Sequence, residues 1–240
     1  MKLTKEEIKF IDNYLIKNEV KFWDVRLELL DHIVSAVEDK IENEGISFNE
    51  ALLDVHYSFG NQPNRFERPK DKIFTKGLYG NTKGFKEFTR QKQKALGSKQ
   101  RKLYWRTFPS YLITSRCIIE LVAVVLTIFT IFQFHQKTAF IVAMILSLLP
   151  EFLKIFPGVF RKASKHSLRA QMAFNISALF MSLNYFWLAG FNEIFEDQQP
   201  KPYIYGIIFY LVLFVFLRHG YNVYKQIMTE NNYEYKSMIA

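Results

Sequence analysis

Cysteine is almost absent from this 240-residue chain, and so are the residue patterns that mark common enzyme families. Cys117 is the only cysteine, which excludes an intramolecular disulfide and a zinc site built from several cysteines. The five histidines do not have the spacing of metal ligands. No His-Glu-x-x-His, Gly-x-Ser-x-Gly, phosphate-binding loop or dinucleotide fingerprint occurs. We therefore expect no metal, no cofactor and no enzymatic activity.

A secretory signal peptide is also missing from the start of the chain. The segment MKLTKEEIKFIDNYL has neither an apolar core nor a small-residue cleavage site. The first membrane span is therefore expected to direct insertion itself.

Charge is distributed unevenly along the chain. Residues 1–60 hold seven Lys and Arg against thirteen Asp and Glu, whereas residues 61–116 hold fifteen against three. The remaining residues are nearly neutral, with ten against seven. The sequence thus predicts an acidic N-terminal part, a basic segment after it, and a membrane part.

Four apolar runs follow the basic segment. A bilayer core about 30 Å thick needs about 20 mostly apolar residues, and each run approaches or exceeds that length. We predict an all-α protein: a small cytoplasmic three-helix domain, a basic juxtamembrane linker with an interfacial helix, a four-helix transmembrane bundle and a cytoplasmic tail. The corresponding ranges are 1–60, 61–110, 111–220 and 221–240, with spans at 111–134, 138–156, 170–191 and 203–218.

The distribution of Lys and Arg among the loops predicts the orientation of the spans. The segments before the first run, between the second and third, and after the fourth are basic, whereas the other two loops hold one Lys each. Since cytoplasmic loops carry the excess of Lys and Arg, both termini are expected in the cytoplasm. The sequence thus predicts a multi-pass membrane protein with both termini in the cytoplasm.

Residues 1–60 read as three short amphipathic helices. Thr4 with Glu7 and Ser47 with Glu50 form capping boxes that begin the first and third helices, and Gly45 and Gly60 end the second and third. The predicted buried stripe of the second helix consists of Trp23, Leu27, Leu30, Val34, Val37 and Ile41. That of the third consists of Ala51, Leu52, Val55 and Phe59.

The segment Glu28–Gly60, ELLDHIVSAVEDKIENEGISFNEALLDVHYSFG, resembles the permease-prefix (HAAS-type) α-helical domain of bacterial membrane proteins. The shared features are an acidic helix with a Leu-Asp-His step, a Gly break, a Ser-x-x-Glu-Ala helix start and a Phe-Gly close. The resemblance implies a regulatory or interaction module without catalytic residues, and it implies the bacterial inner membrane as the location. The chain is too short for the large extracytoplasmic domain of the exporters that carry this prefix, so transport is not implied.

A bundle of about 60 residues buries only a modest core, so we expect it to be stabilised by binding to a partner protein. Asp31 and His32 do not form a catalytic pair, because neighbouring helix residues point about 100° apart. His56 likewise has no catalytic companion in the sequence. The candidate partner-binding residues are Trp23, Leu27, Asp31 and His32.

Aromatic side chains are interleaved with Lys and Arg before the first span. Such a segment suits either nucleic acid or an anionic membrane surface. Its position beside a span favours lipid, because juxtamembrane cations and amphipathic rings lie at the headgroup layer. A salt-dependent contact with the acidic N-terminal part is a further alternative. We expect no nucleic acid partner, and the candidate lipid-contacting residues are Lys99, Arg101, Lys102, Trp105 and Arg106.

Ionisable residues inside apolar spans are costly and are therefore candidates for function. Glu120 and Glu151 are the two carboxylates within the runs, and both fall in the predicted cytoplasmic half. One hypothesis is a polar cluster that binds a ligand or relays protons. The other is a set of interhelical contacts, including an Arg116–Glu120 pair at i, i+4 spacing. The predicted cluster contains Glu120, Glu151, Asn175, Arg116 and Arg218.

Two functions from different classes follow from the sequence. The first is a regulatory or scaffolding membrane protein whose cytoplasmic helical domain binds a partner. The second is a subunit of a transporter or channel that uses Glu120 and Glu151. The sequence is compatible with a homo-oligomer in either case.

Overall fold

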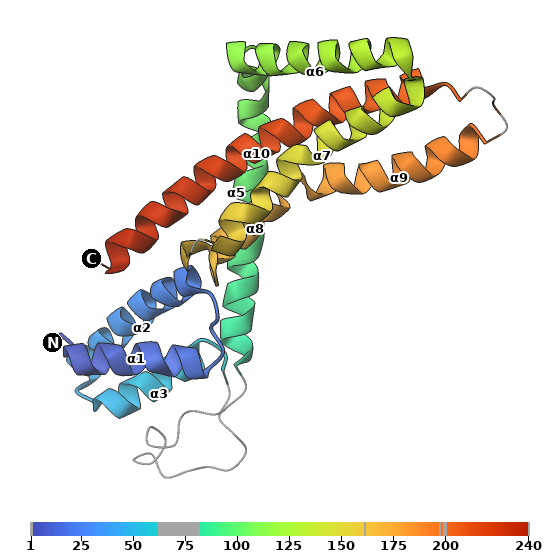
Figure 1. Cartoon of the computed structure of the whole chain (residues 1–240). Coiled ribbons are helices and arrows are strands. Elements are labelled where there is room, and N and C mark those ends of the chain that lie inside the picture. The colour runs from blue at the N-terminus through green and yellow to red at the C-terminus, as the bar shows by residue number, and fades with distance from the viewer. Residues whose placement is uncertain (1, 62–81, 161, 197, 199–200, 240) are drawn as a thin grey trace. The chain divides into compact units, whose positions relative to one another are not determined.

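The structure, a computed structural model, is all-helical in the part of the chain that it describes, which comprises residues 2–61, 82–160, 162–196, 198 and 201–239. Four helical stretches are long and apolar enough to cross a membrane, as the sequence predicted: Ser115–Phe134, Gln136–Phe156, Leu168–Phe191 and Tyr203–Met238. The chain is thus a multi-pass membrane protein. It divides into two compact units, which are described separately: Met1–Ala95 with His166–Leu168, and Leu96–Lys165 with Arg169–Ala240 (Figure 1).

The first unit contains α1 (Lys5–Lys17), α2 (Trp23–Glu44), α3 (Phe48–Ser58) and the first turns of α5 (Lys83–Leu112). Both predicted capping boxes are present, at the N-termini of α1 and α3. Gly45 ends α2 in the left-handed conformation with φ 66°, and Gly60 follows α3 with φ 78°. Since side chains other than Gly disfavour this region, these two glycines fix the helix ends, as predicted.

The buried face of α2 differs from the predicted stripe. Its core residues are Trp23, Val25, Leu29, Ile33 and Val37, and the predicted Leu27 is 38% exposed. The i, i+4 row from Val25 to Val37 is unbroken and apolar, so it forms a better buried seam than the row predicted from alternating steps. Of the residues predicted to be buried in α3, Ala51, Leu52 and Val55 are buried.

An aromatic cluster joins α5 to the first unit. The ring of Phe85, which is 2% exposed, packs edge-on against Tyr14 and His56. Gly84 lies so close to the Phe59 carbonyl oxygen that a Cβ would stand 1.8 Å from it. Only Gly can occupy this position, because a larger residue would clash with the backbone of Phe59.

Helix α5 begins at Lys83, inside the range 61–110 for which the sequence predicts a basic linker with an interfacial helix. The part of that linker from residue 62 to residue 81 lies outside the described residues.

His56, which the sequence left without a companion, is a core residue. It is 1% exposed, and its Nδ1 forms a hydrogen bond with the Tyr14 hydroxyl. Burial disfavours the charged imidazolium and lowers the pKa of His56 to about 4. The unfolded chain therefore binds a proton in a range where the folded one does not, and the stability contributed by neutral His56 is lost as pH falls from about 6.5 to about 4.

We predict that His56 remains neutral at pH 5 in the folded protein. The measurement is an NMR titration of histidine-labelled full-length protein, with the His56→Gln variant identifying the resonance. A His56 midpoint near about 6.5, the value of a solvated imidazole, would contradict the burial of its ring.

The second unit contains the rest of α5 and the membrane helices. Its elements are α6 (Ser115–Phe134), α7 (Gln136–Phe160), η2 (Lys162–Ser164), α8 (Leu168–Phe174), η3 (Asn175–Ser177), α9 (Ala178–Ile194) and α10 (Tyr203–Ile239).

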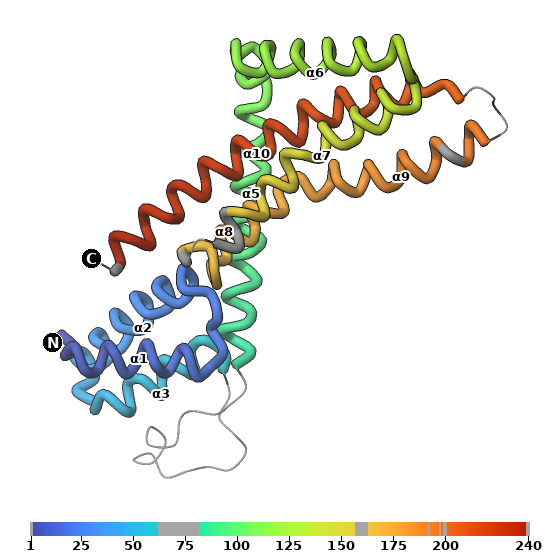
Figure 2. The backbone as a smooth tube through the Cα atoms, in the orientation of Figure 1, coloured from blue at the N-terminus to red at the C-terminus, as the bar shows by residue number. Residues whose placement is uncertain are grey.

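Three boundaries differ from the prediction. The first span begins at Ser115, because the Thr114 side chain caps α6 and Tyr111 still belongs to α5. The third span is interrupted by the 3-10 turn η3. The predicted tail does not form a separate segment, since α10 continues as one helix of 37 residues, about 55 Å long at 1.5 Å per residue (Figure 2).

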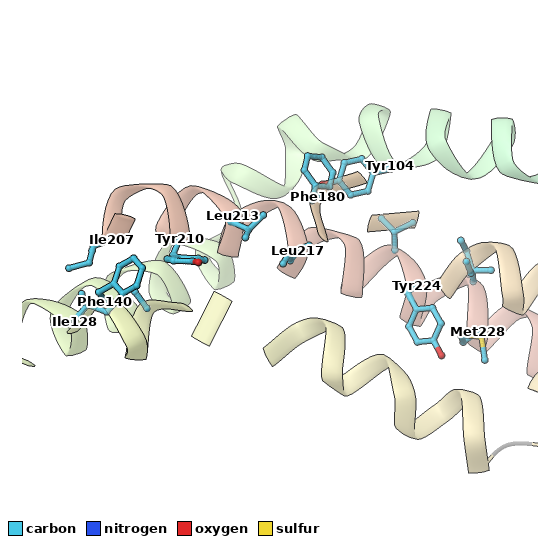
Figure 3. Packing of buried hydrophobic residues seen from close by; sticks show 14 of the residues in the cluster. Tyr104, Ile128, Phe140, Phe180, Ile207, Tyr210, Leu213, Leu217, Tyr224 and Met228 are labelled. Atoms are coloured by element: carbon cyan, nitrogen blue, oxygen red, sulfur yellow. The ribbon is translucent and has the colours of Figure 1, made fainter. Parts of the chain in front are cut away.

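Helices α7 and α10 form the centre of the second unit. Phe140 of α7 packs against Tyr210 of α10, with ring centroids 5.5 Å apart. A Cβ on Gly206 would stand 2.3 Å from the Phe140 ring, so this glycine permits the close approach of the two helices. Figure 3 shows further residues of the same core, among them Leu213 and Leu217.

One face of α6 carries large apolar side chains that are half exposed or more. In a membrane protein such a face is directed toward lipid, which replaces water as the solvent. Its members are Ile118, Ile119, Val122, Leu126 and Phe129.

Candidate functional site

The first ionic cluster forms around Glu120 of α6. Arg218 of α10 binds this carboxylate in a bidentate manner, with Nε–Oε2 and Nη2–Oε1 distances of 2.7 Å. Arg116 adds an Nε–Oε1 contact of 2.9 Å from a side chain that is 69% exposed. The i, i+4 pair predicted between Arg116 and Glu120 is therefore present. Two guanidinium groups around one carboxylate leave the cluster with one net positive charge.

The position of Arg218 explains why the pair is needed. Its side chain is only 12% exposed, and its Nη1 donates a further hydrogen bond to Asn222 Oδ1 at 2.7 Å. A desolvated guanidinium is tolerated when a planar, bidentate partner satisfies it. The Glu120–Arg218 pair thereby ties α6 to α10.

The second ionic cluster forms around Lys154 of α7, whose side chain is fully buried. Its Nζ donates to Glu151 Oε1 at 2.6 Å and also to Ser177 Oγ. The Tyr224 hydroxyl donates to the Lys154 carbonyl oxygen at 3.0 Å, and its ring lies 6.0 Å from Nζ. Three helical segments thus supply the partners of one buried cation.

Ser177 occupies the interruption of the third span. It ends η3, is 0% exposed, and faces Gly220 of α10, where a Cβ would stand 2.5 Å from Ser177 Oγ. Helix interruptions at membrane depth are tolerated where protein groups surround the backbone. The ammonium group of Lys154 therefore meets the third span at its irregular turn.

The sequence-predicted polar cluster is divided by the structure. Glu120, Arg116 and Arg218 come together, whereas Glu151 joins the separate Lys154 cluster. Asn175 is exposed and lines a hollow beside α5 instead. The cluster predicted from the sequence did not include Lys154, Ser177 or Tyr224. The i, i+3 spacing of Glu151 and Lys154 was the signal that could have shown the pair.

Tyr104 is a further residue whose role the sequence did not show. As one of the aromatic residues before the first span it was expected at the headgroup layer, but it is 2% exposed and its hydroxyl donates to the Phe216 carbonyl oxygen at 2.9 Å. Burial raises the pKa of Tyr104, which keeps this hydroxyl protonated as a donor. His219 Nε2 lies 3.0 Å from the Tyr104 carbonyl oxygen, which can only accept, so Nε2 carries the hydrogen. The spacing of Tyr104, Phe108 and Tyr111 along one helical face could have indicated an inward position.

The candidate partner-binding residues of the first unit fall into two groups. Trp23 is 7% exposed and belongs to the core, so its indole cannot serve as a contact surface. Leu27, Asp31 and His32 are exposed on α2, and His32 Nε2 lies 3.9 Å from Glu28 Oε1. The candidate lipid-contacting residues are all exposed on α5: Lys99, Arg101, Lys102, Trp105 and Arg106.

The described residues contain no group of three or more His, Cys, Asp or Glu side chains that could hold a metal ion. Cys117 is buried at the start of α6. Among the described residues, the membrane helices thus hold two separate ionic clusters, Glu120 with two guanidinium groups and Glu151 with one ammonium group.

We predict that the Lys154 and Glu151 substitutions are strongly non-additive. Glu151→Gln leaves a buried ammonium without its carboxylate and should lower the free energy of unfolding by about 3 kcal/mol. Adding Lys154→Met removes the orphaned charge, so the double variant should lose less than Glu151→Gln alone. The measurement is reversible unfolding of the full-length protein in mixed detergent micelles.

Arg116→Gln is the matched control, because it removes a charged partner from an exposed pair. It should change the free energy of unfolding by less than about 1 kcal/mol. If the losses of Glu151→Gln and Lys154→Met simply add in the double variant, the two groups are not a coupled pair.

Comparisons with known proteins give no relative for this chain: no protein-family model matches it, and neither the curated proteins nor the solved structures yield a significant match.

Proposed function

We propose that this chain is a regulatory or scaffolding protein of the bacterial inner membrane whose N-terminal helical unit binds a partner protein in the cytoplasm. The observation that carries the proposal is an apolar and ionisable surface on α2 that the core of its own unit does not use. Leu27 and Asp31 stand one helical turn apart on the exposed face, opposite the buried row of Val25 and Leu29. An exposed Leu flanked by charged residues suits the apolar centre of a protein contact whose rim is polar.

Additional support comes from how the first unit is built. Both capping boxes and the left-handed Gly45 fix its helices, and its core closes around Leu29, Ile33 and Leu52. The unit therefore has no need of Leu27 for its own packing. The succession of a long acidic helix, a Gly break and a Ser-capped helix is also the pattern by which it resembles the permease-prefix domain, a module of interaction rather than catalysis.

The distribution of charge supports the cytoplasmic location. Arg161, Lys162 and Lys165 lie between the second and third spans, and the long basic helix α5 precedes the first. These are the segments that the positive-inside rule assigns to the cytoplasm, and four spans return the chain to the side on which it began. The exposed cations and Trp105 of α5 would then contact the anionic headgroups of the inner leaflet.

We expect Leu27→Glu to abolish partner contact without unfolding the protein. The measurement is quantitative crosslinking in native membranes from a photoreactive residue at position 35, which is exposed on the same face of α2. A charge at the centre of an apolar contact should reduce the yield about tenfold or more.

Asn13→Glu is the matched control, because it adds the same charge at an exposed position of α1. It should leave the crosslink yield unchanged. Equal crosslinking by wild type and Leu27→Glu, or none from wild type, would remove the proposal.

A transporter or channel subunit is the second candidate, and one observation favours it. The buried Lys154 cation lies at the interruption of the third span, and interrupted spans carry the binding sites of many transporters. Against it, Glu120 pairs with Arg116 and Arg218 whereas Glu151 pairs with Lys154, so the two carboxylates belong to separate clusters.

The two candidates differ in their prediction for ion and proton flux in liposomes. Under the leading proposal, wild type and the Glu120→Gln/Glu151→Gln variant should both leave the liposomes as tight as empty ones. Flux through wild type that the double substitution abolishes would establish the second candidate instead. A folding check by circular dichroism accompanies both proteins, since the substitutions also remove ion pairs.

A further inference from the structure

A hollow of about 410 Å³ lies between α5 and the third span, within the second unit. Its volume is in the range of sites that hold small molecules. Helix α5 forms one wall, and α8, η3 and α9 form the other. The lining residues are Gly97, Gln100, Arg101, Met172, Asn175, Ile176, Ala178, Leu179 and Ser182.

Gln100, one of the lining residues, has a hydrogen-bond acceptor without a partner among the described residues. Its side chain is 5% exposed, and its Nε2 donates to the Arg169 carbonyl oxygen at 3.2 Å. This bond fixes the orientation of the amide, because the opposite orientation would place two acceptors against each other. The buried Oε1 then has no partner among the described residues. A buried acceptor without a donor is costly, so the hollow calls for a ligand that supplies a hydrogen-bond donor.

Charge selects the class of ligand. Arg101 is exposed at the hollow and is its only charged lining residue among those described. A guanidinium without a carboxylate beside it suits a phosphate, to which it can donate two parallel hydrogen bonds. A ligand with a cationic headgroup would meet the Arg101 charge with repulsion, so the donor for Gln100 is better supplied by a neutral hydroxyl.

The other wall of the hollow is mostly apolar. Met172, Ile176 and Leu179 lie there beside the polar Asn175 and Ser182, and Leu179 is 65% exposed. Asn175 lies seven residues after the start of the third span at Leu168, about 10 Å along it. This is the depth at which phosphate and glycerol give way to acyl chains, and the exposed Trp105 one turn beyond Arg101 marks the same interface.

We propose that the hollow binds one molecule of an anionic phospholipid whose headgroup carries a hydroxyl group, such as phosphatidylglycerol. Arg101 holds the phosphate, the headgroup hydroxyl donates to Gln100 Oε1, and an acyl chain lies along Ile176 and Leu179. Gly97 keeps the space open on α5. The site differs from general attraction of α5 to an anionic surface, because it has one occupant, a defined orientation and a preference among anionic lipids.

The test is native mass spectrometry of the full-length protein in detergent, titrated with phosphatidylglycerol. One lipid per chain should be retained at concentrations where phosphatidylcholine is not. Arg101→Gln should weaken retention about tenfold or more, as expected for loss of a charge-assisted hydrogen bond. Lys102→Gln removes the same charge from an exposed neighbour that does not line the hollow, and it should alter retention less than about twofold.

Two further variants test the details of the site. Gly97→Leu fills the hollow without changing charge and should abolish retention. Gln100→Leu should reduce the affinity for phosphatidylglycerol to that for phosphatidic acid, whose headgroup lacks the glycerol hydroxyl. Each variant must unfold at the wild-type midpoint, and one that does not is replaced by Gly97→Met or Gln100→Met.

Three outcomes would overturn the proposal. Equal losses with Arg101→Gln and Lys102→Gln would show attraction to surface charge only. Full retention by Gly97→Leu would place the lipid elsewhere. Displacement of the lipid by soluble glycerol phosphate at similar concentration would show an anion site that does not need the acyl chain.

Discussion

The membrane part of this protein depends on one constraint: a charge removed from water must meet an opposite charge of fitting geometry. Arg218 meets Glu120 through two hydrogen bonds of 2.7 Å, and the buried Lys154 meets Glu151 at 2.6 Å. Each cation also donates a hydrogen bond to a neutral group: Arg218 to Asn222, and Lys154 to Ser177. The helices that carry these residues are thereby held in one register, because sliding any of them would expose a bare charge to apolar surroundings.

Helix α10 is the element on which these contacts converge. It supplies Arg218 to the first cluster and Tyr224 to the second, and its carbonyl at Phe216 accepts from Tyr104. Two glycines allow the close approaches: Gly206 faces the Phe140 ring and Gly220 faces Ser177. Larger residues at either position would push the neighbouring helix away and lengthen the polar contacts beside it. The apolar faces left outside this core are those of a protein whose solvent is lipid.

The described part of the first unit is stabilised by helix caps and aromatic packing rather than by buried ion pairs. Lys92 of α5 pairs with Glu28 of α2, an ion pair of the kind expected between an acidic domain and a basic segment. Its side chains are more than one third exposed, so it contributes little. The buried contacts of Phe85 with Tyr14 and His56 hold the start of α5 instead, and these are insensitive to salt.

The helical class, the four apolar spans, both capping boxes and the helix end at Gly45 could be predicted from the sequence. Each of these features depends on residues that are near one another along the chain. Even the Arg116–Glu120 pair was visible as an i, i+4 spacing. The tertiary structure alone decided that Arg218 joins that pair, that Lys154 reaches Ser177 across 23 positions, and that His56 is buried against Tyr14. It also shifted the buried row of α2 away from Leu27, because a helix with apolar residues on several faces buries the row that its neighbours fit. Partners distant in sequence are chosen by which helices pack together, and no periodicity along one helix contains that information.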